Sequence, residues 1–281
     1  MEDYEKREAI EKEARDFWRS FVEEITYHNR FNPQHPLTSF LRNYLQDHSI
    51  TVSADTILYR ARIIKYDPSS DDTGLAKHLH QIECEDFEGY DEKNSFVPPA
   101  NVVAPGRANP ERIVYLYTAK EIITAIGETR PRIFDHISVA KIKLLKDSRF
   151  ADFTSTGNAD KLSLDSAKLS EIIGAFSKPC REEIDYIPTQ FVAEFVKSLG
   201  YDGIYFASSF VPGGTNITIF DPTIAKAIAS APYRMDSITY RARRIFPLKD
   251  LDTFDIVVSN KTECDRTKLV LVETRSLNVI L

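Results

Sequence analysis

The sequence has few cysteines, no long apolar run and no concentration of positive charge. Cys84, Cys180 and Cys264 are far apart and form no CxxC pair, so the sequence indicates neither a disulfide framework nor a zinc site. It contains no run of about 18 apolar residues, which a membrane-spanning helix needs. The formal net charge is −6 and the basic residues are scattered, so the overall charge attracts neither nucleic acid nor an anionic membrane.

Two further motifs are missing. The glycine turn PGRAN, at residues 105–109, lacks the GKS or GKT ending of a P-loop, so no nucleoside triphosphate chemistry is implied. The first residues, MEDYEKREAIEKEARD, are charged where a signal peptide has an apolar core, and we expect a cytoplasmic protein. With 281 residues, of which 42% are hydrophobic, the chain is able to form a full core.

The first 50 residues predict two amphipathic helices. Apolar side chains within residues 2–27 recur at the three- and four-residue spacing of one helix face. Pro33 and Pro36 end this pattern, which returns at residues 37–45. We predict a helical extension over residues 1–50 that packs its apolar face against a main domain over residues 51–281.

The main domain mixes strand and helix patterns. Residues 51–66 are rich in β-branched and aromatic side chains and predict one strand, with Arg60 and Arg62 on the same side. The acidic segment 67–94 has no clear period and predicts a long loop or insertion. The sequence favours an α+β fold with a mixed β core and flanking helices. Further strands are predicted at 113–118, 137–144, 237–246, 254–258 and 268–273, and helices at 119–127, 162–176 and 186–200.

The stretch from Tyr201 to Phe220 combines two short strand patterns with a polar turn between them. Ser208 and Ser209 lie in this turn, ahead of a pair of glycines. Rigid strands would hold these hydroxyls at the mouth of a sheet, an arrangement that suits a pocket. The alternative is a hairpin-like connection with ordinary surface serines.

Two other patterns suggest different chemistry more weakly. Arg42, Asn43 and His48 match the arginine–spacer–histidine pattern of helical-hairpin ribonucleases, but 50 residues are too few for that domain. The acidic segment also contains His78, His80, Cys84 and Glu85, without a recognisable metal-ligand spacing. We therefore favour solvated loop residues there and predict no metal site.

Five segments occur in an order that resembles the RES domain, a family named for an arginine, a glutamate and a serine. The resemblance covers roughly residues 55–225 and makes Arg60, Glu128 and Ser208 the three residues of the name, with Ser209 as the alternative hydroxyl. The segments are LYRAR at 58–62, PGRAN at 105–109, LYTAKEIITAIGE at 116–128, YIPTQFVAEFVKSLGYDGIYFASS at 186–209 and NITIFDP at 216–222.

The resemblance implies an ADP-ribosyltransferase-like fold and an enzyme whose substrate is NAD+. Such enzymes cleave NAD+ by phosphorolysis to ADP-ribose 1″-phosphate, with inorganic phosphate as co-substrate, or by hydrolysis. No resident cofactor is implied. Many members are bacterial toxins, so an antitoxin with an Xre-type helix-turn-helix is an expected partner, alongside a homodimer. The alternatives are an ADP-ribosyltransferase that modifies a macromolecule, a module that only binds nucleotides, and the ribonuclease.

The resemblance also implies roles for individual side chains. Glu128 would offset the positive charge that develops on the ribose, and Arg60 would bind phosphate oxygens in two-point geometry. Ser208 would donate to a phosphate or ribose oxygen. The expected substrate-binding residues are Tyr59, Arg107, Tyr117 and Asn216.

Overall fold

A computed structural model describes residues 2–64, 90–154, 163–178, 180, 182–242, 256–259 and 270–273. None of the helices within these ranges is long and apolar enough to span a bilayer. The helices are α1 (Glu2–Glu23), the π-helix η1 (Glu24–His28), α2 (Leu37–Asp47), α4 (Glu92–Ser95), α5 (Ile122–Glu128), α6 (Leu164–Ser177) and α7 (Ile187–Ser198), with 3-10 turns η2 (Ala100–Val102), η3 (Glu183–Tyr186) and η4 (Pro222–Ile224). The strands are β1 (Ser49–Val52), β2 (Ile57–Ile63), β3 (Leu116–Ala119), β4 (His136–Leu144), β5 (Ser148–Phe153), β6 (Gly203–Ala207), β7 (Thr215–Ile219), β8 (Ala225–Arg234), β9 (Thr239–Ala242), β10 (Ile256–Ser259) and β11 (Val270–Glu273).

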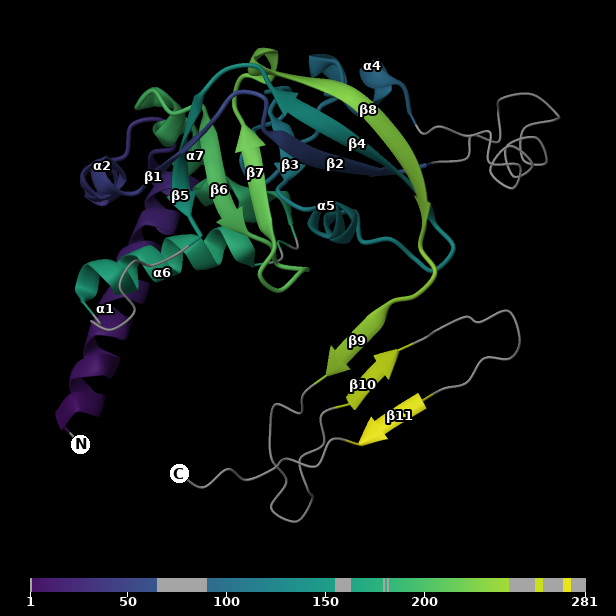
Figure 1. The fold of residues 1–281 in the computed structure, drawn as a ribbon. Helices are drawn as coiled ribbons and strands as arrows, with labels where there is room; N and C mark the ends of the chain where they lie inside the picture. The colour runs from purple at the N-terminus through teal and green to yellow at the C-terminus, as the bar shows by residue number, and fades with distance from the viewer. Residues whose placement is uncertain are drawn as a thin grey trace.

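Eight of the strands form one mixed sheet in the order β1-β5-β6-β7-β3-β2-β4-β8 (Figure 1). Strands β5 and β6 run parallel, and the other neighbouring strands are antiparallel. Strands β9, β10 and β11 form a separate antiparallel sheet. This arrangement of helices around a mixed sheet confirms the predicted α+β class.

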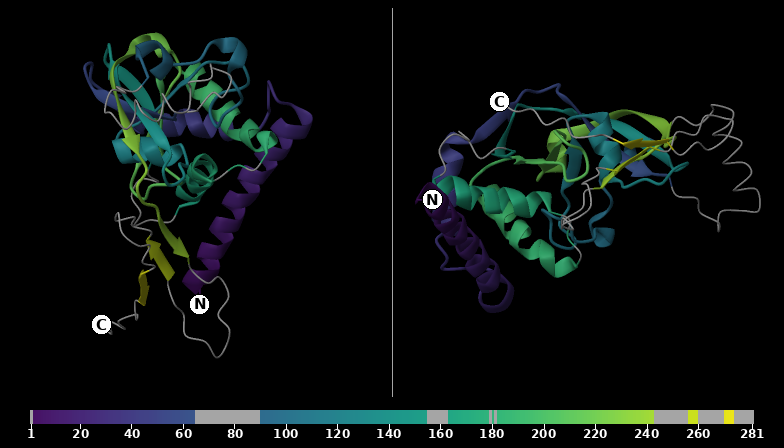
Figure 2. Two further views of the ribbon diagram at one scale, coloured as in Figure 1. Left: turned by 90° about the vertical axis from the view of Figure 1, so that its right-hand side faces the viewer. Right: turned by 90° about the horizontal axis from the view of Figure 1, so that it is seen from below.

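The N-terminal helices share a hydrophobic core with the rest of the chain. Phe21 of α1 and Leu41 of α2 are fully buried in one cluster with Phe153 of β5, Phe176 of α6 and Val192 of α7. Helix α1 crosses α6 (Figure 1), and the right-hand view of Figure 2 also places α1 at the end of the molecule away from β8. The predicted packing of these helices is therefore present, while a domain boundary at residue 50 stays a prediction.

A second cluster fills the opposite face of the sheet. Leu58 of β2, Leu116 of β3, Ile142 of β4 and Phe150 of β5 are buried there together. The sheet therefore contributes buried side chains to a core on each of its two faces.

Strands β2 and β3 are neighbours in the sheet but are barely paired. They pair at a single position, Tyr59 with Ala119, whereas β2 and β4 pair along the whole of β2. Helix α5 packs beside this junction against β2, β3 and β7. Because so few ladder bonds join β2 to β3, side chains from both strands are able to border a cavity between them.

The prediction of one strand over residues 51–66 is wrong. Strand β1 ends at Val52, Asp55 adopts a positive φ of 66° in the turn, and β2 begins at Ile57. The two strands then pair with different partners, β5 and β4. The sequence patterns also missed β5 and β8, whose charged, alanine and proline residues have low strand propensity.

The residues of the ribonuclease pattern have separate partners. The guanidinium of Arg42 lies 5.7 Å from the ring centroid of Phe195. The ring of His48 stacks on Tyr44 at 4.0 Å, and its Nδ1 lies 2.9 Å from the carbonyl oxygen of Tyr44. The histidines and the cysteine at residues 78–85 lie outside the described residues.

We expect Leu41→Ala to lower the free energy of unfolding by about 2–5 kcal/mol, because it leaves a cavity in the shared core. Phe31→Ala is the matched control: Phe31 is 94% exposed, and its loss should change stability by less than about 0.5 kcal/mol. Urea unfolding followed by circular dichroism measures both. Equal stability of the two variants would mean that α2 does not contribute to the core.

Candidate active site

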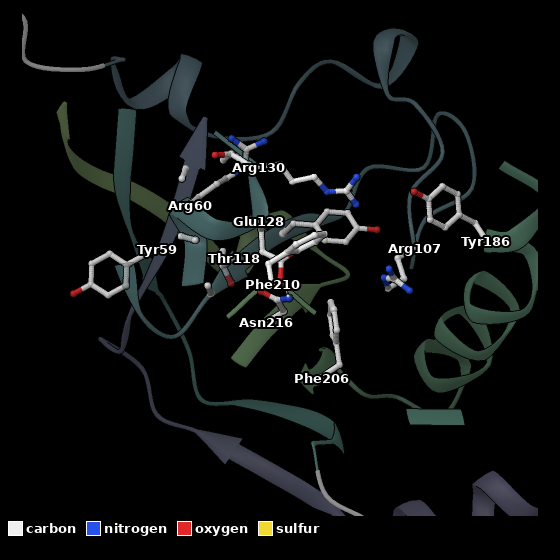
Figure 3. Close-up of a pocket in the computed structure, with 15 residues that line it drawn as sticks. Tyr59, Arg60, Arg107, Thr118, Glu128, Arg130, Tyr186, Phe206, Phe210 and Asn216 are labelled. Atoms are coloured by element: carbon white, nitrogen blue, oxygen red, sulfur yellow. Dashed lines mark hydrogen bonds between the residues drawn. The ribbon is translucent and has the colours of Figure 1, made fainter. Parts of the chain in front are cut away.

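A cavity of about 310 Å³ opens where β2, β3, β7 and α5 meet. It contains all the predicted site residues except Ser208. Those that line it are Tyr59, Arg60, Arg107, Tyr117, Glu128 and Asn216. Segments that are far apart in the sequence thus come together at the divergence of β2 and β3 (Figure 3).

Glu128 is the acidic residue of this cavity and the last residue of α5. A carboxylate is unfavourable at a helix C-terminus, where the helix dipole is negative. Two donors compensate: Ser208 Oγ donates to Glu128 Oε1 at 2.7 Å, and Asn216 Nδ2 donates to the same oxygen at 2.6 Å. Oε1 is therefore held in place, and no described side chain forms an ion pair with the carboxylate.

Ser208 bonds to Glu128 but does not line the cavity. Its Oγ also accepts hydrogen bonds from the backbone N–H groups of Phe210 and Val211, at 3.1 and 3.0 Å. The neighbouring Ser209 instead donates to the carbonyl oxygen of Ser177 at the end of α6. Of the two hydroxyls, Ser208 is the one in contact with Glu128.

Arg60 is a desolvated cation without a carboxylate partner among the described residues. Its Nη1 donates to the carbonyl oxygen of Ser95 at 3.3 Å. Burial, together with the nearby Arg62, lowers the pKa of Arg60 to about 10. Because an anion beside this guanidinium would offset the cost of burying its charge, the site favours an anionic ligand.

Arg107 is presented by the turn at residues 105–109, but its guanidinium is already engaged. Nη1 and Nη2 donate at 2.7 Å to the carbonyl oxygens of Ala175 and Lys178, at the end of α6. A cation at a helix C-terminus is favourable. A guanidinium has five N–H donors, so Arg107 holds α6 and retains donors for a ligand.

Tyr117 anchors the same turn. Its hydroxyl accepts from the backbone N–H of Ala108 at 2.9 Å and donates to Asn109 Oδ1 at 2.7 Å. Burial raises the pKa of the Tyr117 phenol well above its ordinary value, so it stays protonated and keeps this donor. A Cβ at Gly106 would lie 2.5 Å from Asn109 Oδ1, which is why the turn needs glycine there.

The ring of Tyr59, a predicted substrate-binding residue, points away from Glu128 in Figure 3 and packs with the cluster around Ile126.

The cavity also contains residues that the sequence analysis missed. Further aromatic rings and a third arginine line it. They are Tyr186, Phe206, Phe210 and Arg130. Position in the sequence gave no signal for them, because their separate segments meet only in the folded chain.

The cavity is lined by more positive than negative side chains, with three arginines and one carboxylate. Its arginines and aromatic walls suit an anionic ligand that carries a ring. Residues 79–241 match the model of the RES domain family. This match covers more than half of the chain, and the protein belongs to the RES domain family. Glu128 and Ser208 lie within the matched residues, and Arg60 lies before them.

The chain is also similar to a chain in a solved structure, "Crystal structure of the M.tuberculosis MbcT-MbcA toxin-antitoxin complex". The identity is 12% and the TM-score 0.38, over 69% of this chain and 92% of that chain. A likeness of this size carries no argument about function. Among curated proteins, none matches this chain.

We expect Arg60→Met to raise the free energy of unfolding, on the order of 1 kcal/mol at pH 7, because it removes a partly buried charge that has no carboxylate partner among the described residues. The folded-state pKa of about 10 lies below the ordinary pKa of an arginine. The cost is therefore present in full below pH 10 and becomes smaller as the pH rises above 10, where the folded state loses the charge first. The exposed Arg132 provides the control, Arg132→Met, and urea unfolding measures both. A less stable Arg60→Met would show that Arg60 supports the fold.

Proposed function

We propose that this protein cleaves the bond between nicotinamide and ribose in NAD+, most favourably with inorganic phosphate as acceptor, and acts as a bacterial toxin. The observation that carries the proposal is a single carboxylate, held at Oε1 by two hydrogen bonds, in a cavity that also contains three arginines. Membership of the RES domain family supports it. No cofactor besides the two substrates is part of the proposal.

The chemistry suits a carboxylate. The bond between ribose C1″ and the pyridinium nitrogen breaks, and its electron pair stays on the nitrogen, so nicotinamide leaves as a neutral molecule. Its departure needs little acid catalysis, and the barrier is set by the positive charge that develops on the ribose. Glu128 would offset that charge. A fixed carboxylate does so without reorganisation at the moment of reaction.

The acceptor decides the product. A phosphate oxygen that bonds to C1″ gives ADP-ribose 1″-phosphate, whereas water gives ADP-ribose and releases a proton. Arg60, which has no carboxylate partner among the described residues, and Arg107, which has spare donors, would bind phosphate oxygens. Tyr117 and Phe206 supply flat apolar faces for the ring or ribose. Arg60 and Arg107 together favour phosphate over water as acceptor.

Ser208 would act through Glu128. Its hydroxyl donates to Oε1 and does not line the cavity, so we assign it a positioning role in place of direct contact with phosphate or ribose. Asn216 would position the same oxygen from β7.

The remaining parts of the proposal follow from the family. They are an ADP-ribosyltransferase-like catalytic domain over residues 51–281, a cytoplasmic location and an antitoxin partner with a helix-turn-helix. Hydrolysis of NAD+ and transfer of ADP-ribose to a macromolecule remain alternatives, because both would use the same carboxylate.

We expect the wild-type protein to release nicotinamide from NAD+ in the presence of phosphate, and Glu128→Gln to lower kcat about 10²- to 10³-fold. Glutamine keeps the shape but removes the charge that offsets the developing cation. Proton NMR with and without phosphate follows nicotinamide and the anomeric product. Release that does not depend on phosphate identifies a hydrolase, and radiolabel from NAD+ on protein or nucleic acid identifies a transferase. If the folded, ligand-free protein leaves NAD+ intact, the enzymatic proposal is wrong.

We expect Ser208→Ala to lower kcat about tenfold with little change in KM, because loss of one hydrogen bond misplaces the carboxylate that acts in the transition state. Ser209→Ala is the matched control. Its hydroxyl bonds to α6, and we expect kcat to change by less than about threefold. Steady-state nicotinamide release measures both. A larger effect of the Ser209 substitution would make Ser209 the operative hydroxyl.

A further inference from the structure

Arg130 and Phe210 form a pair that the RES resemblance did not assign. The guanidinium carbon of Arg130 lies 4.5 Å from the ring centroid of Phe210, in cation–π geometry. Both residues line the cavity, both are exposed to solvent, and both lie beside Glu128 in Figure 3. They therefore stand at the opening of the cavity.

The backbone that carries Arg130 adopts a conformation of unfavourable free energy. Arg130 follows the end of α5 with a φ of 51°, in the left-handed region that side chains other than glycine rarely adopt. Its backbone N–H donates to the carbonyl oxygen of Gly127 at 3.1 Å. A Cβ at Gly127 would lie 2.5 Å from Val211, so the end of α5 packs directly on the turn that carries Phe210.

The pair is joined to the carboxylate network. The backbone N–H of Phe210 donates to Ser208 Oγ, which donates to Glu128. A ligand that orders Phe210 would therefore also order the turn that holds Glu128. This coupling links the opening of the cavity to its chemical centre.

Arg130 differs from the other two arginines of the cavity in its hydrogen bonding. Arg60 donates to Ser95, and Arg107 donates to two carbonyl groups. Among the described residues, the Arg130 guanidinium has no hydrogen bond or ion pair, and only the ring of Phe210 supports it. Its full fork of donors is free for an anion.

The size of the cavity indicates which part of a ligand meets Arg130. About 310 Å³ lies at the lower end of the range for ligand pockets, roughly 300–1,000 Å³. A cavity of this size suits the nicotinamide riboside half of a dinucleotide, and the diphosphate would then emerge at the opening. We propose that Arg130, stacked on Phe210, binds this diphosphate and makes the enzyme selective for the dinucleotide over nicotinamide riboside. This inference rests on the proposed function.

The test compares NAD+ with nicotinamide riboside, which has the scissile bond but no phosphate. We expect Arg130→Ala to lower kcat/KM for NAD+ about 10- to 100-fold, the usual effect of losing a charged hydrogen bond. For nicotinamide riboside the change should stay within about twofold. Phe210→Leu keeps an apolar side chain but removes the ring, and should lower kcat/KM for NAD+ to a smaller degree.

Arg132→Ala is the matched control, since it removes the same charge from an exposed side chain that does not line the cavity. It should leave kcat/KM for both substrates unchanged. An equal loss for NAD+ and nicotinamide riboside on Arg130→Ala, no loss for either, or the same loss with Arg132→Ala would overturn the inference. Circular dichroism confirms that each variant is folded.

Calorimetry separates this inference from the proposed function. ADP carries the diphosphate and adenosine but no scissile bond, so its binding does not depend on catalysis. If the wild type releases no nicotinamide, the proposed function fails, yet ADP binding that weakens about 10-fold or more on Arg130→Ala still supports the diphosphate site. ADP that does not bind to the wild type, or binds equally to both proteins, overturns it.

Discussion

The single paired position between β2 and β3 is the constraint on which the site depends. Tyr59 pairs with Ala119, and beyond this point the two strands separate. Helix α5 packs against β2, β3 and β7 beside this point, and Glu128 at its end lines one cavity with Arg60 and Asn216. A fully paired sheet would fill the same space with ladder hydrogen bonds, and these three side chains would not share one cavity.

The polar groups of this cavity are held by hydrogen bonds from neighbouring side chains. Ser208 and Asn216 fix one oxygen of Glu128, and Tyr117 fixes the turn that presents Arg107. Thr189 and Gln190 of α7 bind the backbone of the same turn. Preorganisation of this kind lets a site stabilise charge that develops during a reaction without moving its own groups.

The features of the arginines that favour ligand binding lower the stability of the folded protein. Burial lowers the pKa of Arg60 to about 10, and Arg130 has an unfavourable positive φ, so both features oppose the folded state of the empty protein. The large clusters on the two faces of the sheet, including Phe21 and Leu41 from the N-terminal helices, offset such costs. The N-terminal helices thus contribute to a site that they do not line.

The sequence alone determined the elements with strong local signals. The helical period of residues 2–27 and the helix predicted at residues 186–200 were readable because neighbouring residues decide them. The order of the RES segments also identified Arg60, Glu128 and Ser208 as candidate site residues. Only the tertiary structure decided that Ser208 bonds to Glu128, that Arg107 engages α6, and that Arg130 stacks on Phe210. These contacts join residues up to about eighty positions apart, and such pairings depend on strand order and helix packing, which no local pattern encodes.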